Sequence, residues 1–438
     1  MTGAPDARRP LPPLSSPAFA RAFALAVFAA VFARYAIVAV AGEVTWATIV
    51  AGLCAVGAAV LYVRRDELEL VRLAPTTLVL LVAWAGASVF WSPSAADSLG
   101  GWSAFAALAF LAVVLGHVRD ALQTVRALGD VLRWLLGISL ALEVLSGILL
   151  DLPIPFLGIQ GAIAELGPVQ GIFGTRNALG FVTVIALITF LVEFRTQSVS
   201  VATAVGSVVL AGALAALSGS PTVVVVVAAT TGVAALALWT MRRVPVAWRG
   251  RAQAALGSVV VVGMAGAWAF RAPLVDTLGA GADLTLRTDL WARLVHLSEM
   301  RPVQGFGWFG DWVNDVVPFA LVPLGLGGTH ASALNAYLDV LLQLGAVGLL
   351  LFVALGGLGL ARGWLVASDR RSVVHAWAPL TLVALLTVSM FESFTLTGAG
   401  WLLLGLCAVR AGQSRSWRER LEQRMASSPT GGSEEGRL

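Results

Sequence analysis

The chain has 438 residues and a formal net charge of +4; 58% of its residues are hydrophobic and only 12% are charged. Soluble proteins carry about 25% charged residues, so this composition excludes an ordinary soluble protein and indicates an integral membrane protein. All 29 basic residues are arginine, so an arginine is informative here only through its position.

Twelve apolar segments predict an all-α polytopic membrane protein with about 12 transmembrane helices. At about 1.5 Å per residue, a helix of about 20 residues crosses about 30 Å of hydrocarbon, and we expect each segment to form one span. Lipid-exposed strands are excluded, because hydrocarbon cannot satisfy the backbone of an open sheet edge. The predicted spans are residues 22–41, 44–63, 76–91, 99–116, 132–150, 178–194, 199–217, 222–240, 254–270, 344–361, 377–391 and 396–409.

These spans divide the chain into five parts. We expect a cytoplasmic tail over residues 1–21, a transmembrane bundle of about nine helices over 22–271 and a large extracytoplasmic loop with short helices over 272–343. Transmembrane helices over 344–410 and a disordered cytoplasmic tail over 411–438 complete the chain. The Pro-rich start has no small-residue cleavage site, which predicts an uncleaved tail rather than a signal peptide.

The arginines of the connecting segments predict the orientation. When the spans alternate from a cytoplasmic N-terminus, most arginines fall on one side, the positive-inside pattern of a plasma (inner) membrane protein with both termini cytoplasmic. An arginine on the outer side or within a span needs a partner. These exceptions are Arg34, Arg176, Arg271, Arg287, Arg293 and Arg301. Glu143 also lies within a predicted span, where an internal hydrogen bond is expected; for Arg34, snorkelling and an internal ion pair stay open.

The first half of the long loop predicts an amphipathic helix. A cap at Asp283 or Thr285 would begin it, and Pro302 would end it near Met300. Arg287 and Trp291 stand one turn apart on its surface, so a guanidinium is expected beside an indole; an interfacial helix with a snorkelling arginine is the alternative. Its apolar stripe is formed by Leu286, Leu290, Leu294 and Leu297.

After Pro302, residues 305–310 match the pattern G-x-G-x-x-G. We reject a nucleotide-binding interpretation, because no strand precedes the pattern and no β-α-β unit surrounds it. The glycines are instead expected to let the backbone turn tightly. Trp308, Phe309 and Trp312 are then expected at the level of the lipid headgroups.

A second loop helix is predicted from a cap near Ser332 into the span that begins at Leu344. Asn335, Asp339 and Gln343 recur every four residues and form a polar stripe, which is either a solvated face or part of a site. His330 lies just before the cap, where the positive end of a helix favours anions.

These residues resemble a known family, the O-antigen ligase and polymerase family of bacterial lipid-linked glycan transferases. The similarity covers roughly Gly171 to Gly348. It departs from the family in the four residues between His330 and Asn335, in Gln343 where Glu is frequent, and in Pro221 where Arg often follows the serines. The motifs that carry it are Arg287-x-Asp289-x-Trp291, Pro302-Val303-x-Gly305-x-Gly307, His330, Asn335-x-Tyr337-Leu338 with Gly345 and Gly348, the segment Gly171–Gly180 with Arg176 and Asn177, and Ser218-x-Ser220.

The resemblance implies a GT-C-like helical bundle and a glycosyltransferase. The enzyme would move a glycan from an undecaprenyl-diphosphate carrier to a hydroxyl of a glycan, lipid or protein acceptor at the outer membrane face, as a polysaccharide polymerase or an O-antigen ligase. Arginine suits the diphosphate leaving group because it is permanently charged and bidentate. Arg287 and His330 are therefore the expected catalytic residues. The expected substrate-binding residues are Arg176, Asn177, Asp289, Trp291, Asn335, Tyr337 and Asp339.

We expect no metal and no other cofactor, because His117 and His375 fall on the cytoplasmic side and no D-x-D motif occurs. Membrane lipids are expected partners and nucleic acid is not. Two alternative functions stay open at this point, a transporter or lipid-glycan flippase and a peptidoglycan glycan polymerase. A transporter would favour related halves with binding groups near the midplane, whereas here the polar residues gather in an outer loop.

Overall fold

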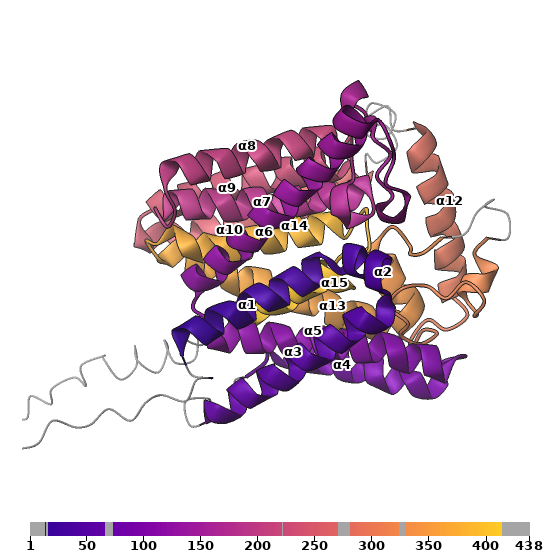
Figure 1. Cartoon of the computed structure of the whole chain (residues 1–438). Coiled ribbons are helices and arrows are strands. Elements are labelled where there is room, and N and C mark those ends of the chain that lie inside the picture. Colours follow the sequence, from indigo (N-terminus) through magenta and orange to yellow (C-terminus); the bar gives the residue numbers. More distant parts are fainter. Residues whose placement is uncertain are drawn as a thin grey trace, which may run out of the picture.

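The computed structural model describes residues 14, 16–65, 73–220, 222–269, 281–323 and 330–413. Within these ranges it contains fourteen α-helices, most of which lie side by side in a bundle (Figure 1). The helices are α1 (Pro17–Phe32), α2 (Arg34–Ala41), α3 (Glu43–Val63), α4 (Thr76–Ala87), α5 (Ala95–Val118), α6 (Ala121–Val144), α7 (Arg176–Arg195), α8 (Val201–Leu217), α9 (Val227–Arg243), α10 (Val246–Ala269), α12 (Gly281–Ser298), α13 (Ala336–Asp369), α14 (Trp377–Val388) and α15 (Gly398–Gly412).

The described helices confirm an all-helical, multi-pass membrane protein. Six of them, α3, α5, α6, α7, α9 and α13, are long and apolar enough to cross a membrane, and the bent pair α1 and α2 makes a seventh if it is one span. Helices α4, α8, α14 and α15 are apolar but shorter. Each of the twelve predicted segments overlaps a helix, while the number that crosses the membrane stays a prediction.

The segment predicted as one straight span over residues 22–41 is broken. Helices α1 and α2 meet at an angle of 70°, and Arg34 is the first residue of α2. Its guanidinium pairs with Glu43 (3.3 Å) and Asp311 (3.0 Å) and lies over the ring of Trp46. The prediction of an unbroken helix was wrong, and the pairing gives the reason: the bend turns a charge within an apolar segment toward two carboxylates. Of the two interpretations of Arg34, the ion pair is confirmed.

Arginines of the predicted cytoplasmic connections join helix ends at one end of the bundle. This arginine-rich end contains the start of α1, the junctions of α5 with α6 and of α9 with α10, the end of α13 and the end of α15. Such side chains can cap carbonyl groups as well as pair with carboxylates. The contacts run from Arg119 to Pro17 O (3.4 Å), from Arg242 to Ala367 O (2.8 Å), from Arg249 to Asp369 (3.0 Å) and from Arg410 to Arg119 O.

Residues 301–323 pack against the opposite end of the bundle, with α12 beside them (Figure 1, right). Ser88 Oγ accepts a hydrogen bond from Trp308 N (2.8 Å), and Ser98 Oγ donates one to Trp308 O (2.8 Å). The backbone N–H and C=O groups of Trp308 are thereby bound to the end of α4 and the start of α5, which lie far away in the sequence. Residues 301–323 are therefore an integral layer of the fold at this end, which we call the loop end.

A central contact of the bundle joins α5 and α15. The ring of Trp401 stacks on Phe105 with 3.9 Å between centroids, and its indole nitrogen donates to Phe105 O (2.9 Å). A buried tryptophan thus keeps its polar group satisfied while its ring fills the core. A Cβ on Gly405 would stand 3.1 Å from Ala112, so the two helices approach closely. The contact between α5 and α15 thereby supports the part of the bundle against which residues 301–323 pack.

Helix α13 is interrupted at Gly345, whose φ of +67° is not helical. An interrupted helix within an apolar bundle frees backbone groups that need partners. The segment 302–307 supplies them, because its backbone runs along the break. The bonds are Phe306 N to Leu342 O (3.1 Å), Gly307 N to Gln343 O (2.8 Å) and Ala346 N to Pro302 O (2.8 Å). The loop and the helix therefore form one hydrogen-bonded joint.

The pattern G-x-G-x-x-G turns tightly, as predicted. Gly305, Gly307 and Gly310 all have positive φ, at 68°, 113° and 75°, values that glycine adopts without steric cost. The expected position of the aromatic residues was wrong, since Trp308, Phe309 and Trp312 are only 1%, 4% and 7% exposed. The turns bring the backbone down onto the bundle, so the rings fill the protein core instead of meeting lipid headgroups.

Candidate functional site

Helix α12 lies against the loop through the predicted leucine stripe. Leu290, Leu294 and Leu297 are at most 3% exposed and pack with Phe306 and Phe319, which confirms the three described members of that stripe. The helix begins at Gly281, so the predicted cap at Asp283 or Thr285 was wrong. Polar residues are tolerated in the first helical turn, where the positive end of the helix dipole stabilises a carboxylate.

The Arg287 side chain points into the protein rather than to water. The residue as a whole is 7% exposed, and its guanidinium donates to Phe391 O and to Glu392 Oε1, the latter at 3.2 Å. Glu392 is itself 4% exposed. Two opposite charges that are both removed from water stabilise each other strongly, because the local dielectric is low. The alternative of a snorkelling arginine at this position is wrong.

Asn177 binds the same carboxylate oxygen from another helix. Its Nδ2 donates to Glu392 Oε1 (2.7 Å), and its Oδ1 accepts from Ser220 Oγ (2.6 Å). Glu392 thus links Arg287 on α12 to the start of α7 and to the residues that follow α8. We call Arg287, Glu392, Asn177 and Ser220 the Glu392 network.

Arg176 is the first residue of α7 and is adjacent to the Glu392 network. Thr175 caps this helix by accepting a hydrogen bond from Ala178 N (3.1 Å). The Arg176 side chain is exposed, and among the described residues it has no hydrogen-bonding partner. A free guanidinium at a helix N-terminus is a favourable place for an anion.

Glu143 fixes the turn before α7 through hydrogen bonds to its backbone. This residue is 1% exposed, and its Oε1 accepts from Gln170 N (3.0 Å) and Gly171 N (2.8 Å), which confirms the internal hydrogen bond expected for it. Gly174 has a φ of +84°, and a Cβ there would lie 2.4 Å from the ring of Tyr35. The glycines of this motif therefore let the backbone pass close to its neighbours.

His330 opens the segment that leads into α13. It is partly buried, and no hydrogen bond or ion pair joins it to another described residue. Trp291, one turn after Arg287, donates from its indole nitrogen to Ala333 O (3.0 Å). This bond fastens α12 to the segment that begins at His330, and so brings the parts of the chain that carry the two predicted catalytic residues together.

The cap of α13 is Asn335 rather than the predicted Ser332. Asn335 Oδ1 accepts from Tyr337 N (3.0 Å) and Leu338 N (3.2 Å). Leu334 has a positive φ of 50°, which keeps the chain out of a helix until Asn335. The side chains of Asn335 and Tyr337 also reach α14 and the residues after it, as Asn335 Nδ2 donates to Met390 O (3.2 Å) and the Tyr337 hydroxyl to Leu386 O (2.9 Å).

Asp339 is a buried hub and not part of a solvated face. It is 1% exposed and Gln343 is fully buried, so the solvated alternative is wrong. Both carboxylate oxygens are saturated with donors, which offsets the cost of burying the group. The donors are Trp312 Nε1 (2.8 Å), Gln343 Nε2 (2.8 Å), Ala333 N (3.2 Å) and Ser393 Oγ (2.8 Å).

Five of the nine predicted site residues meet the short stretch 386–393 at the end of α14. Arg287, Asn177, Asn335, Tyr337 and Asp339 all hydrogen-bond to it. Within the described residues, Arg176, Asp289, His330 and Trp291 make no hydrogen bond to this stretch. Trp291 bonds to Ala333, whose backbone N–H donates to Asp339. Sequence reasoning missed this stretch, and Glu392 with it. The available signal was Glu392 itself, an acidic residue between two apolar segments, in a chain whose outer-side arginines needed partners.

No group of three or more His, Cys, Asp or Glu residues within the described ranges is arranged to hold a metal ion. The charged groups of the candidate site at the loop end include Arg287, Glu392 and Arg176. Their arrangement, one buried guanidinium paired with a carboxylate and one exposed guanidinium adjacent to it, suits the binding of a phosphorylated ligand.

Comparison with known families places a large part of this site in a described domain. Residues 206–353 match the family model described as O-Antigen ligase. No curated protein matches the chain. The matched part includes Ser220, Arg287, His330, Asn335 and Asp339, whereas Arg176, Asn177 and Glu392 lie outside it.

Proposed function

We propose, on the premise that residues 206–353 are an O-antigen ligase domain, that the protein transfers a glycan from an undecaprenyl-diphosphate carrier to a hydroxyl acceptor. The family implies transfer of a lipid-linked glycan. The carrier, the outer face of the plasma membrane and the roles of single residues are our proposal. The acceptor is a glycan, lipid or protein, so the enzyme is a surface polysaccharide polymerase or an O-antigen ligase.

The observation that carries this proposal is the meeting of Arg287 and Asn177 on one oxygen of Glu392. It brings α12 to the start of α7, where Arg176 stands exposed. Two guanidinium groups would then face the two phosphates of the donor. Arginine binds phosphate oxygens in a bidentate manner and keeps its charge at any physiological pH.

In the reaction, an acceptor hydroxyl attacks the anomeric carbon of the donor sugar. The new carbon–oxygen bond forms as the bond to the diphosphate breaks, and undecaprenyl diphosphate leaves with the bonding electrons. Negative charge therefore grows on the diphosphate in the transition state. Fixed positive charges aimed at that position supply the largest part of such catalysis, and we assign this role to Arg287 and Arg176 without a metal ion or other cofactor.

Glu392 keeps Arg287 in place before the donor arrives. A buried guanidinium without a counter-charge would be costly, and the carboxylate stabilises it while also orienting Asn177. Arginine presents five N–H donors in a fixed fork, and in this proposal the guanidinium of Arg287 donates to a phosphate of the substrate. Glu392 is thus a positioning residue in this proposal.

His330 is proposed to take the proton of the acceptor hydroxyl or to donate a hydrogen bond at the reacting centre. An imidazole has an unperturbed pKa of about 6.5, which suits a general base near neutral pH. The bond from Trp291 to Ala333 keeps its segment beside α12. Asp289, which is exposed on α12, is proposed to bind sugar hydroxyls. Asn335, Tyr337 and Asp339 are proposed to keep the residues around the site in position.

A transfer assay with purified protein and carrier-linked oligosaccharide tests this function. We expect Arg287→Ala and His330→Ala to lower the transfer rate by about 10²-fold or more at normal abundance in the membrane. The matched controls are Arg293→Ala and His296→Ala on the same helix, which should change it less than about threefold. Rates near wild type for both site variants would end the proposal.

A second experiment separates the proposed transferase from a flippase. In a strain that lacks the protein, a missing transferase leaves carrier-linked glycan accumulated at the outer face of the membrane. A missing flippase leaves it at the inner face. Accumulation at the inner face would therefore contradict the proposed activity even if single variants were impaired.

A further inference from the structure

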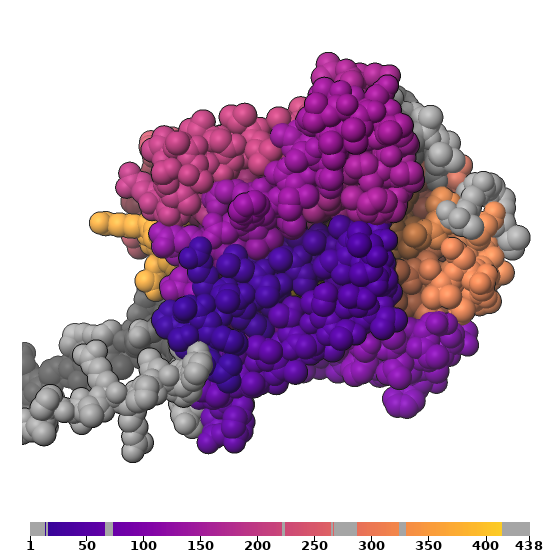
Figure 2. Space-filling model, viewed as in Figure 1, coloured from indigo at the N-terminus to yellow at the C-terminus, as the bar shows by residue number. Residues whose placement is uncertain are grey.

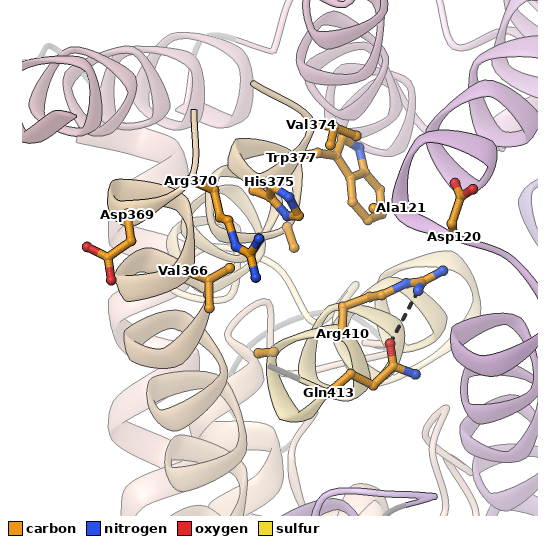
Figure 3. A pocket seen from close by; sticks show the side chains of 13 residues that line it. Asp120, Ala121, Val366, Asp369, Arg370, Val374, His375, Trp377, Arg410 and Gln413 are labelled. Atoms are coloured by element: carbon orange, nitrogen blue, oxygen red, sulfur yellow. Dashed lines mark hydrogen bonds between the residues drawn. The ribbon is translucent and has the colours of Figure 1, made fainter. Parts of the chain in front are cut away.

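The cavity between α13, α14 and α15 lies at the arginine-rich end, far along the bundle from the Glu392 network. Its volume is about 570 Å³. Figure 3 shows the side chains of Arg370, His375 and Arg410 around this space, with Trp377 and Asp120 at its edge. It belongs neither to the glycan site nor to the matched domain, which ends at residue 353.

The lining of this cavity is divided between apolar and polar groups. Apolar and small residues form one part of the lining, and charged or hydrogen-bonding side chains form the other. A cavity of this kind suits an amphiphile with an apolar chain and a polar head. The apolar part is formed by Gly363, Val366, Val374, Trp377, Ala378, Ala121 and Ala411, and the polar part by Asp120, Asp369, Arg370, His375, Arg410 and Gln413.

The two carboxylates of the lining are already engaged. Asp369 pairs with Arg249 (3.0 Å), and Asp120 caps α6 by accepting from Gln123 N (2.7 Å). Arg370 is exposed and makes no hydrogen bond to a described residue. With Arg249 included, the arginines outnumber the carboxylates by one, so the cavity has an excess of one positive charge before His375 is protonated.

Arg410 is fixed at the wall of the cavity. Its guanidinium donates to Arg119 O, to Thr124 Oγ1 (2.9 Å) and to Gln413 Oε1 (3.2 Å), while its buried Nε has no partner. Arg370 is a second cation of the lining, exposed and without a hydrogen-bonding partner among the described residues. A phosphodiester, with one negative charge, would compensate the excess.

We propose that this cavity binds the phosphodiester headgroup of an anionic phospholipid from the adjoining leaflet. Basic pockets between transmembrane helices are known sites for such headgroups. The acyl chain would lie along the apolar part near Val366 and Trp377, and Arg370 would contact the phosphate. The predicted orientation makes this the cytoplasmic leaflet; the binding itself does not depend on the transfer reaction.

The full-length protein in detergent tests the proposal, with its thermal unfolding measured against added lipid. Phosphatidylglycerol should raise the melting temperature of the wild type, whereas phosphatidylcholine should not. Arg370→Gln should weaken the apparent affinity for phosphatidylglycerol by about fivefold, as one basic contact contributes about 1 kcal/mol. The matched control is Arg371→Gln, an exposed neighbour outside the lining, which should bind like the wild type.

Two further arms identify the ligand. Val366→Phe fills the apolar part and should reduce the lipid effect while Arg370 remains. Glycerol 1-phosphate and inorganic phosphate, tested alone, should stabilise far less than the lipid. Equal lipid binding by the Arg370→Gln and Arg371→Gln proteins, equal binding of phosphatidylcholine, or full stabilisation by free phosphate would each overturn the proposal.

Discussion

Arg287 and Asn177 donate hydrogen bonds to the same oxygen of Glu392. One residue lies on the helix of the long loop and the other at the start of a helix in the bundle, so a single carboxylate fastens the two parts together. The Arg287 and Glu392 side chains are only 8% and 5% exposed. This pair supports both the fold and the proposed diphosphate site.

The first prediction concerns the energy of that pair. Glu392→Ala leaves a buried guanidinium without this counter-charge and should lower the free energy of unfolding by about 3–5 kcal/mol. The double variant with Arg287→Ala should be less destabilised than the sum of the two single variants. A double-mutant cycle on chemical unfolding in detergent measures the coupling, which we expect to be at least about 1 kcal/mol. Strict additivity would show that the two charges do not interact.

The second prediction concerns the break in α13. Gly345→Ala forces a positive φ on alanine and places its Cβ 2.2 Å from Val303 O, so we expect a loss of several kcal/mol in stability. The control is Gly357→Ala on the same helix, where a Cβ meets nothing within 4 Å. That change should stabilise the protein by up to about 1 kcal/mol. Similar melting temperatures for the two variants would contradict the described joint.

The third prediction concerns Asp339. Asp339→Asn replaces one acceptor oxygen with a donor that faces other donors, so we expect a loss of about 2–4 kcal/mol. The transfer rate per folded molecule should fall as well, since Trp312 and Ser393 lose their common partner. Asp315→Asn, at an exposed position, should leave both stability and rate unchanged. An Asp339→Asn protein as stable as this control would mean that the carboxylate is not needed for the fold.

The fourth prediction concerns orientation. In a Cys54→Ala background, a membrane-impermeant maleimide should label Glu165→Cys in intact cells, because this exposed residue lies at the loop end. Ser372→Cys, exposed at the arginine-rich end, should be labelled only after permeabilisation. The reverse pattern would put the Glu392 network in the cytoplasm and remove its access to an outward-facing donor.

Hydropathy predicted the helical segments well, because the length of an apolar run is a local property of the sequence. The bend after Ala33 was missed, although Arg34 within an apolar run was its signal. The Glu392 network was missed for a different reason. Its members come from α7, the turn after α8, α12 and the segment after α14, and hydropathy does not say which helices are neighbours.

The aromatic residues show the same limit. A run of Trp and Phe between glycines fits a membrane interface equally well in the sequence alone. The ring of Trp308 faces the bundle, as its contact with the ring of Phe105 shows (4.5 Å between centroids). The polar stripe of Asn335 and Asp339 was recognised correctly as a pattern, but whether it faces water depends on Trp312 and Ser393, which come from elsewhere in the chain.

The joint at Gly345 has a mechanical consequence. If segment 302–307 were lifted away, carbonyl groups of α13 would lose their donors inside an apolar layer, at a cost of about 1–3 kcal/mol for each group. This part of the molecule therefore behaves as a fixed frame rather than a hinged cover. Under the proposed function, a long polyprenyl donor would fit around that frame, approaching sideways from the lipid, and product would leave without the frame coming apart.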